Sequence, residues 1–169
     1  MKNIDVVRAV RLAFERFSSQ GVKAAASFGE VRGGESSRGR ELAIMEARQI
    51  VTAVISLEAR FHLALMARVN DGSMAFLQGL FDDLVSFVAH YEPDALAYGK
   101  AGLQYWVRHW LTGFGSFREF GRENGIHHET AGNFYRQHVE VVLHSWLVAA
   151  CGELEPLLQK IYSMELEAA

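Results

Sequence analysis

Apolar residues recur every three or four positions along most of this chain, and only two prolines interrupt them in 169 residues. This period places apolar side chains on one face of an α-helix, whereas the alternation typical of half-buried strands is hard to find. Proline ends or kinks helices because it lacks a backbone donor and clashes with the preceding turn. A chain with so few prolines can hold long helices, and we predict an all-α fold, a helical bundle.

Length and composition favour a protein with a core of its own. Half of the residues are apolar and the length is close to that of one domain, so the core needs no covalent staples. Cys151 is the single cysteine, which excludes an internal disulfide and a cysteine-based zinc site and favours a reducing, cytoplasmic setting. Charged residues break up the N-terminal segment, unlike a signal peptide, and we expect no membrane partner.

The spacing of apolar residues and the local composition together predict three segments. Residues 1–19 form an N-terminal helix with Val6, Val10 and Phe14 on its apolar face. Residues 20–40 contain five glycines and three serines among scattered charges, and this composition predicts a flexible Gly/Ser/Arg arm. Residues 41–169 form a helical domain.

Turn-forming residues divide this domain further. One long helix is expected over 41–69, followed by a turn with Ser73 as the next N-cap. Pro93 suits the first position of another helix, which should end near Gly113. The last helix is expected to carry Pro156 in its first turn. Its acidic and apolar faces suit the core, or else a dimer or polymerase interface.

The most informative stretch is 115–138, where residue types match the requirements of a helix-turn-helix. Two short helices that cross over a tight turn need a glycine in the turn, which Gly125 supplies. Gly121, four positions earlier, allows the helices to approach closely. Phe120 and Ile126 are placed to hold the two helices together.

Both helices of this unit carry further supporting residues. Ala131 and Phe134 lie six and nine residues after the turn glycine, where the second helix should face inward. Ser116 and Glu119 have the spacing of a capping box at the start of the first helix. We therefore predict a helix-turn-helix over 115–138, in the C-terminal half of the bundle.

If this unit binds DNA, its second helix enters the major groove with its polar side outward. Asparagine can pair with adenine and arginine with guanine, glutamate can accept from cytosine, and threonine can reach a phosphate or a thymine methyl group. The residues expected at the bases are His127, His128, Glu129, Thr130, Gly132, Asn133 and Arg136. The residues expected at the phosphates are Ser116 at the helix start, Arg118 and Arg122, with Arg108 on the preceding helix as a further contact.

Residues 101–150, including the segment G-I-H-H-E-T-A at 125–131, resemble the helix-turn-helix of bacterial and phage regulators. Asn124 departs from that pattern, since many members have an apolar residue there. The position of the unit in the last third of the chain is similar to the Q-type late antitermination proteins of phages and prophages. This resemblance implies a transcription regulator that binds double-stranded DNA, acts on RNA polymerase and lets transcription pass terminators. The arm and the acidic helices would then be polymerase or self-association surfaces.

The charge distribution allows a small DNA contact surface. The net charge is −3, yet residues 101–138 hold four Lys/Arg against three Asp/Glu. Such a balance does not support a large nonspecific electrostatic contact.

Other functions are predicted less well by the residues. Neither phosphate-loop nor nucleophile-elbow motifs are found, so we do not expect an enzyme, and no cofactor is implied. His138 and His144 are six positions apart, on different faces of one helix, so no metal site is expected either. Two alternatives stay open: a simple DNA-binding repressor or packaging subunit, and a helical protein-interaction module whose helix-turn-helix is only architectural.

Overall fold

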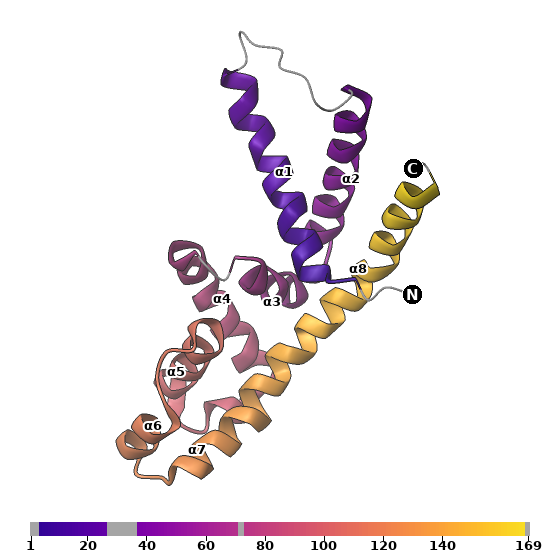
Figure 1. Ribbon diagram of the computed structural model, residues 1–169. Coiled ribbons are helices and arrows are strands. Elements are labelled where there is room, and N and C mark those ends of the chain that lie inside the picture. Colours follow the sequence, from indigo (N-terminus) through magenta and orange to yellow (C-terminus); the bar gives the residue numbers. More distant parts are fainter. Residues whose placement is uncertain (1–3, 27–36, 71–72, 168–169) are drawn as a thin grey trace. The chain divides into compact units, whose positions relative to one another are not determined.

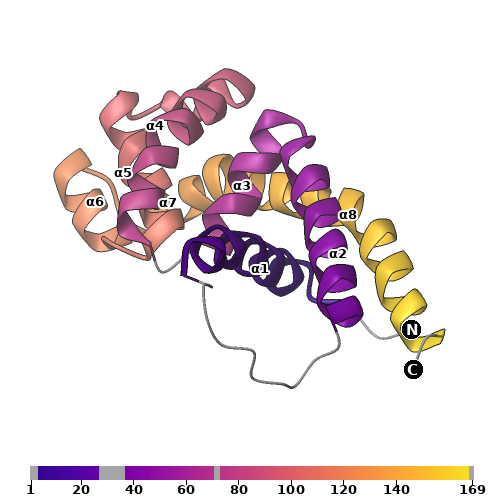
Figure 2. The ribbon, with the colours of Figure 1, turned by 90° about the horizontal axis from the view of Figure 1, so that it is seen from above.

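A computed structural model describes residues 4–26, 37–70 and 73–167 of the chain. These residues form helices joined by short turns, and no strand occurs among them. The all-α prediction is confirmed. Figures 1 and 2 show the helices from two directions.

The chain divides into two compact units, which we treat separately. The first consists of residues 1–57 and 151–169, and the second of residues 58–150. The division thus falls at 57/58 and 150/151, whereas the sequence led us to expect segment boundaries at 19/20 and 40/41.

The first unit pairs α1 (Val6–Ala26) with α2 (Ser37–Ile55), and both views show the two helices side by side (Figures 1 and 2). Val10 and Val54 are fully buried. The C-terminal part of α8 (Val141–Glu167) adds Leu158, which is 1% exposed. Packing of amphipathic faces therefore accounts for this unit.

The predicted arm over 20–40 is wrong at both of its ends. Helix α1 continues to Ala26 and α2 already begins at Ser37. Lys23 and the alanines after it are strong helix formers, and their propensity prevails over Gly21. The rest of the arm, 27–36, lies outside the described residues.

The single helix expected over 41–69 is in fact two, α2 and α3 (Ala59–Val69). The backbone leaves the helix at Ser56, whose hydroxyl donates to the carbonyl of Thr52 at 2.9 Å. Glu58 then adopts φ −54° and ψ 140°, which is not helical.

The second unit holds α3, α4 (Met74–Tyr91), the 3₁₀ turn η1 (Pro93–Leu96), α5 (Gly99–Thr112), α6 (Phe117–Asn124), α7 (His128–Tyr135) and the π-helical segment η2 (Arg136–Glu140). One apolar core joins these elements and the start of α8. Its fully buried large side chains are Leu84, Val88, Leu103, Trp106, Val107, Phe120, Val139 and Leu143.

Three predicted helix ends in this unit can be compared with the structure. Ser73 precedes α4 as expected, although its side chain makes no cap hydrogen bond. Gly113 ends α5 with φ +70°, as expected. Pro93 begins only a 3₁₀ turn, and α5 starts separately at Gly99, whose φ of +72° breaks the helix.

The helical run that starts with α7 continues through η2 into α8, and Pro156 lies inside α8 rather than in the first turn of a new helix. Gly152 is the residue whose carbonyl loses its partner at Pro156. Within the described part of the chain, one helical run, His128–Ser163, is long and apolar enough to cross a membrane. Core helices of this length share that property, and 28% of the qualifying 18-residue stretch is buried.

Candidate nucleic-acid interface

Helix α6 begins and ends at the residues expected from the sequence. The Ser116 hydroxyl accepts from the backbone N–H of Glu119 at 3.1 Å, and this bond caps the helix start. Gly125 ends α6 with φ +67°, in the left-handed region that favours glycine.

The second half of the predicted capping box is wrong. The Ser116 N–H donates to the hydroxyl of Tyr105 at 2.7 Å rather than to Glu119. That hydroxyl in turn donates to the Ser116 carbonyl at 3.0 Å or the Glu119 carboxylate at 3.1 Å. Tyr105 of α5 thus fixes the start of α6. The Ser116 N–H is engaged, so the N–H groups of Phe117 and Arg118 are the ones left for an anion.

Helices α6 and α7 approach closely at Gly121. A Cβ atom on Gly121 would lie 2.6 Å from the carbonyl oxygen of Ile126 and 3.3 Å from the backbone nitrogen of His128. The Ile126 N–H donates to the Gly121 carbonyl at 2.9 Å. The requirement for a small residue here, expected from the spacing, is confirmed.

The inward side of α7 differs in part from the prediction. Ala131 is fully buried as expected, while Phe134 is only half-buried, 4.8 Å from the ring of Tyr98. Gly132 was expected to face DNA, but it is buried, and a Cβ there would lie 3.4 Å from the Phe117 ring. The buried residues of α7 are Ala131, Gly132 and Tyr135, so Tyr135 rather than Phe134 is its large buried side chain.

Tyr135 packs among aromatic rings. Its centroid lies 5.3 Å from that of Trp106 and 5.8 Å from that of Phe117. Burial, with a smaller contribution from the nearby Glu140 carboxylate, raises the pKa of Tyr135 to about 12. The phenol is therefore neutral at physiological pH and serves packing.

The outer side of α7 keeps most of the residues expected to face bases. His127, Glu129, Thr130, Asn133 and Arg136 are exposed, and His128 is half-buried. The Arg136 guanidinium donates to the Asn133 side-chain oxygen at 2.8 Å, so these two residues form a pair. They lie one turn apart on the same face.

His127 precedes α7 and caps it. Its Nδ1 accepts from the backbone N–H of Glu129 at 3.4 Å, which assigns the proton of the neutral ring to Nε2. The ring of His128 lies 4.1 Å from that of His127. His127 therefore presents a donor at the start of α7.

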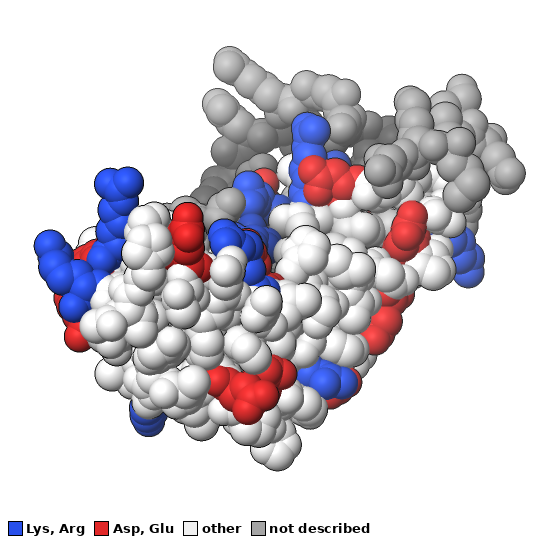
Figure 3. Space-filling view, turned by 90° about the horizontal axis from the view of Figure 1, so that it is seen from below, with Lys and Arg blue, Asp and Glu red and all other residues white. Residues whose placement is uncertain are grey.

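The arginines expected at phosphates all have exposed side chains. Arg118 and Arg122 lie on α6, one turn apart, and neither forms an ion pair within the described part of the chain. Arg108 on α5 is exposed and lies 5.5 Å from the ring of Phe81. Seen from below, the surface carries separate small groups of basic and acidic side chains on a mainly uncharged background (Figure 3).

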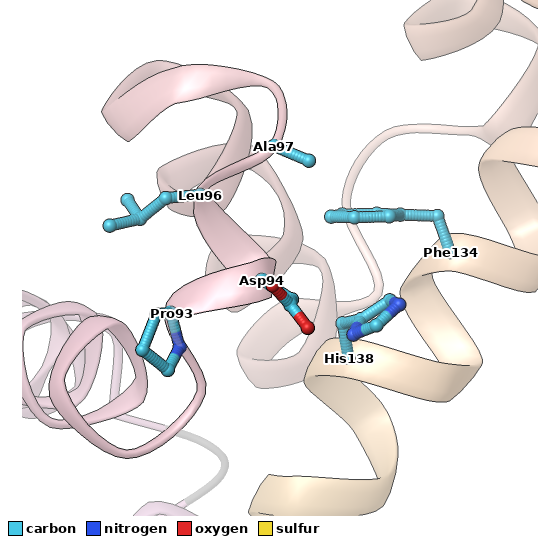
Figure 4. A pocket seen from close by; sticks show the side chains of 6 residues that line it. All are labelled: Pro93, Asp94, Leu96, Ala97, Phe134 and His138. Atoms are coloured by element: carbon cyan, nitrogen blue, oxygen red, sulfur yellow. The ribbon is translucent and has the colours of Figure 1, made fainter.

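Sequence reasoning missed a second polar group in the same unit. Glu92, Asp94 and His138 place one ligand-type atom each within 4.8 Å of one another. A pocket of about 470 Å³ adjoins Asp94 and His138 (Figure 4). The carboxylates are more than forty positions from the histidine, so spacing along one helix could not find them.

Comparison with models of known protein families, with curated protein sequences and with solved structures finds no match for this chain.

Proposed function

We propose that this chain is a sequence-specific double-stranded DNA-binding protein that regulates transcription. The observation that carries the proposal is the exposed polar side of α7, where Asn133 in the last turn pairs with Arg136, the first residue of η2. Phe120, Ala131 and Tyr135 fix this helix from the opposite side. A rigid helix with a polar outer side is what major-groove readout requires.

Base contacts in this proposal come from the exposed side of α7. The Asn133–Arg136 pair reads guanine through the amide nitrogen and the remaining guanidinium N–H groups, which are donors. It reads adenine when the second lone pair of the Asn133 oxygen accepts from the adenine N6 group. Thr130 and the Nε2 of His127 reach bases or phosphates near the helix start.

Phosphate contacts come from α6. Arg118 and Arg122 lie without ion-pair partners among the described residues, and the N–H groups of the first turn of α6 favour an anion. Two arginine contacts predict a slope of log Kobs against log salt of about −2. This modest electrostatic contribution agrees with the scattered charges in Figure 3.

The step at RNA polymerase rests on the resemblance to Q-type antitermination proteins. We propose that the DNA-bound protein engages paused polymerase and allows terminator readthrough. Transcription of a terminator template with purified polymerase separates this role from that of a simple repressor or packaging subunit, which leaves readthrough unchanged.

Selection from a random duplex library tests DNA binding directly. The full chain should enrich one motif over successive rounds, and the selected site should bind at least 1,000-fold more tightly than scrambled DNA, about the lower end for specific proteins. Arg8→Ala in the first unit is the control, since it removes an exposed arginine elsewhere. Failure to enrich any motif would favour the alternative, a protein-interaction module.

A further inference from the structure

A histidine and two carboxylates converge where α4 ends and η2 begins, away from the outer side of α7. Glu92 lies between α4 and η1, Asp94 lies in η1, and His138 lies in η2. The Nδ1 of His138 is 2.8 Å from Oε1 of Glu92. Figure 4 shows Asp94 and His138 next to each other, with Phe134 beside the imidazole.

We propose that Glu92, Asp94 and His138 bind a divalent transition-metal ion, with Zn²⁺ as the best match. Zinc takes imidazole nitrogen and carboxylate oxygen at about 2.0 to 2.2 Å, and three protein ligands leave one position open. This site does not depend on DNA binding.

The distances are close to those that a zinc ion requires. Ligand atoms around tetrahedral zinc lie about 3.3 Å apart, as its bond lengths imply. The distance from Oε1 of Glu92 to Nδ1 of His138, 2.8 Å, must therefore increase slightly. The other ligand atoms, which lie within 4.8 Å of one another, must move closer together. Rotations about side-chain bonds of the exposed Asp94 and the half-buried Glu92 accomplish both changes.

Charge also favours a cation at this point. Two carboxylates face one imidazole, and among the described residues neither carboxylate forms an ion pair with Lys or Arg. The side chains of Glu92 and His138 are each 29% exposed, so water screens them only in part. A divalent ion neutralises both carboxylates and binds the neutral imidazole.

The backbone that presents His138 is unusual. Residues Arg136–Glu140 form a π-helical turn, which inserts a residue and rotates the following helix by about 100°. Such turns occur often at functional sites. Here the turn presents His138 to Glu92 and Asp94.

The adjoining pocket provides room for the open coordination position. It has a volume of about 470 Å³, and its walls are Pro93, Asp94, Leu96, Ala97, Phe134 and His138 (Figure 4). A water molecule or a small ligand in this pocket reaches an ion held by Asp94 and His138.

The competing explanation is a structural hydrogen bond between Glu92 and His138 that holds η1 to η2. Asp94 distinguishes the two explanations, since no side-chain hydrogen bond or ion pair of Asp94 is found in the described part of the chain. A purely structural pair does not need the Asp94 carboxylate, whereas a three-ligand site does.

Isothermal titration of the metal-free full chain with ZnCl₂ near neutral pH tests the proposal. We expect one site per chain, weakened at least about tenfold by Asp94→Asn and by His138→Gln. Zinc should also raise the Tm of the wild type but not of Asp94→Asn. His144→Gln is the matched control, an exposed histidine on the same helical run, and it should bind zinc like the wild type.

Asp94→Asn keeps the Glu92–His138 bond, so its result stands even if His138→Gln unfolds the protein. Absence of zinc binding by the wild type would overturn the proposal. Equal binding by the wild type and Asp94→Asn would also overturn it. If binding instead disappears in His127→Gln/His128→Gln, the metal sits on the adjacent exposed histidines and the proposed site is wrong.

Discussion

Tyr135 shows how one buried side chain sets a measurable property of the second unit. Its phenol has a folded pKa of about 12 against 10.0 for the free group, because burial disfavours the charged form. Because this pKa is higher in the folded than in the unfolded chain, the contribution of Tyr135 to the free energy of unfolding is fully present below pH 10. That contribution is lost as the pH rises from 10 to about 12.

The free energy of unfolding measured in urea should therefore fall more steeply with pH in this window for the wild type than for Tyr135→Phe. Phenylalanine keeps the ring contacts with Trp106 and Phe117 and removes the ionisable group. Absorbance near 295 nm reports phenolate formation directly. Identical pH dependence of the two proteins would contradict the burial of this hydroxyl.

At the scale of elements, the α6–α7 junction depends on the absence of a side chain at Gly121. Gly121→Ala places a Cβ against backbone atoms, 2.6 Å from the carbonyl oxygen of Ile126. We expect a loss of about 1 to 3 kcal/mol, the usual cost of overpacking. Gly79→Ala in α4 is the control, since nothing lies within 4 Å of its Cβ and alanine favours helices by about 1 kcal/mol.

Chemical denaturation of both variants measures this difference. Gly79→Ala should be as stable as the wild type or more stable, and Gly121→Ala should be less stable. A neutral Gly121→Ala would show that the two helices do not meet as described.

Local chemistry made the ends of α6 and the burial of Phe120 and Ala131 predictable from sequence. Ser116 acts through its hydroxyl on a backbone N–H three residues later, and Gly125 acts through its own left-handed backbone, so neighbouring residues suffice to identify both. Contacts between residues distant in sequence were not predictable. The Ser116 N–H, which the capping box assigns to Glu119, donates to the hydroxyl of Tyr105 instead. The π-helical turn at 136–140 changes which face of the helix the later residues occupy, and the apolar periodicity of the sequence does not predict this turn.

At the scale of the whole molecule, the second unit contains a large apolar core. Every buried member of its apolar cluster lies between Leu63 and Trp146. A fragment of residues 58–150 should therefore unfold cooperatively by itself, with a helical circular dichroism spectrum.

The same fragment should bind the selected DNA site like the full chain. Trp106→Ala in the fragment is the control, since loss of a buried tryptophan costs about 3 to 5 kcal/mol and should abolish the transition. A fragment without a cooperative transition would show that the second unit depends on the first.

The most direct test of the central claim compares losses of affinity on the selected site and on scrambled DNA. Asn133→Ala and Arg136→Ala should each weaken specific binding by about 1 to 3 kcal/mol and relax base preference. Because the two side chains form one pair, the double variant should lose less than the sum of the single losses.

Arg118→Ala should instead weaken binding to both DNAs alike and reduce the salt slope by about 1, as loss of a phosphate contact does. This pattern would establish that the end of α7 and the start of η2 read bases and that α6 holds the DNA backbone. Unchanged specificity in Asn133→Ala and Arg136→Ala, or a sequence-selective loss in Arg118→Ala, would contradict the account.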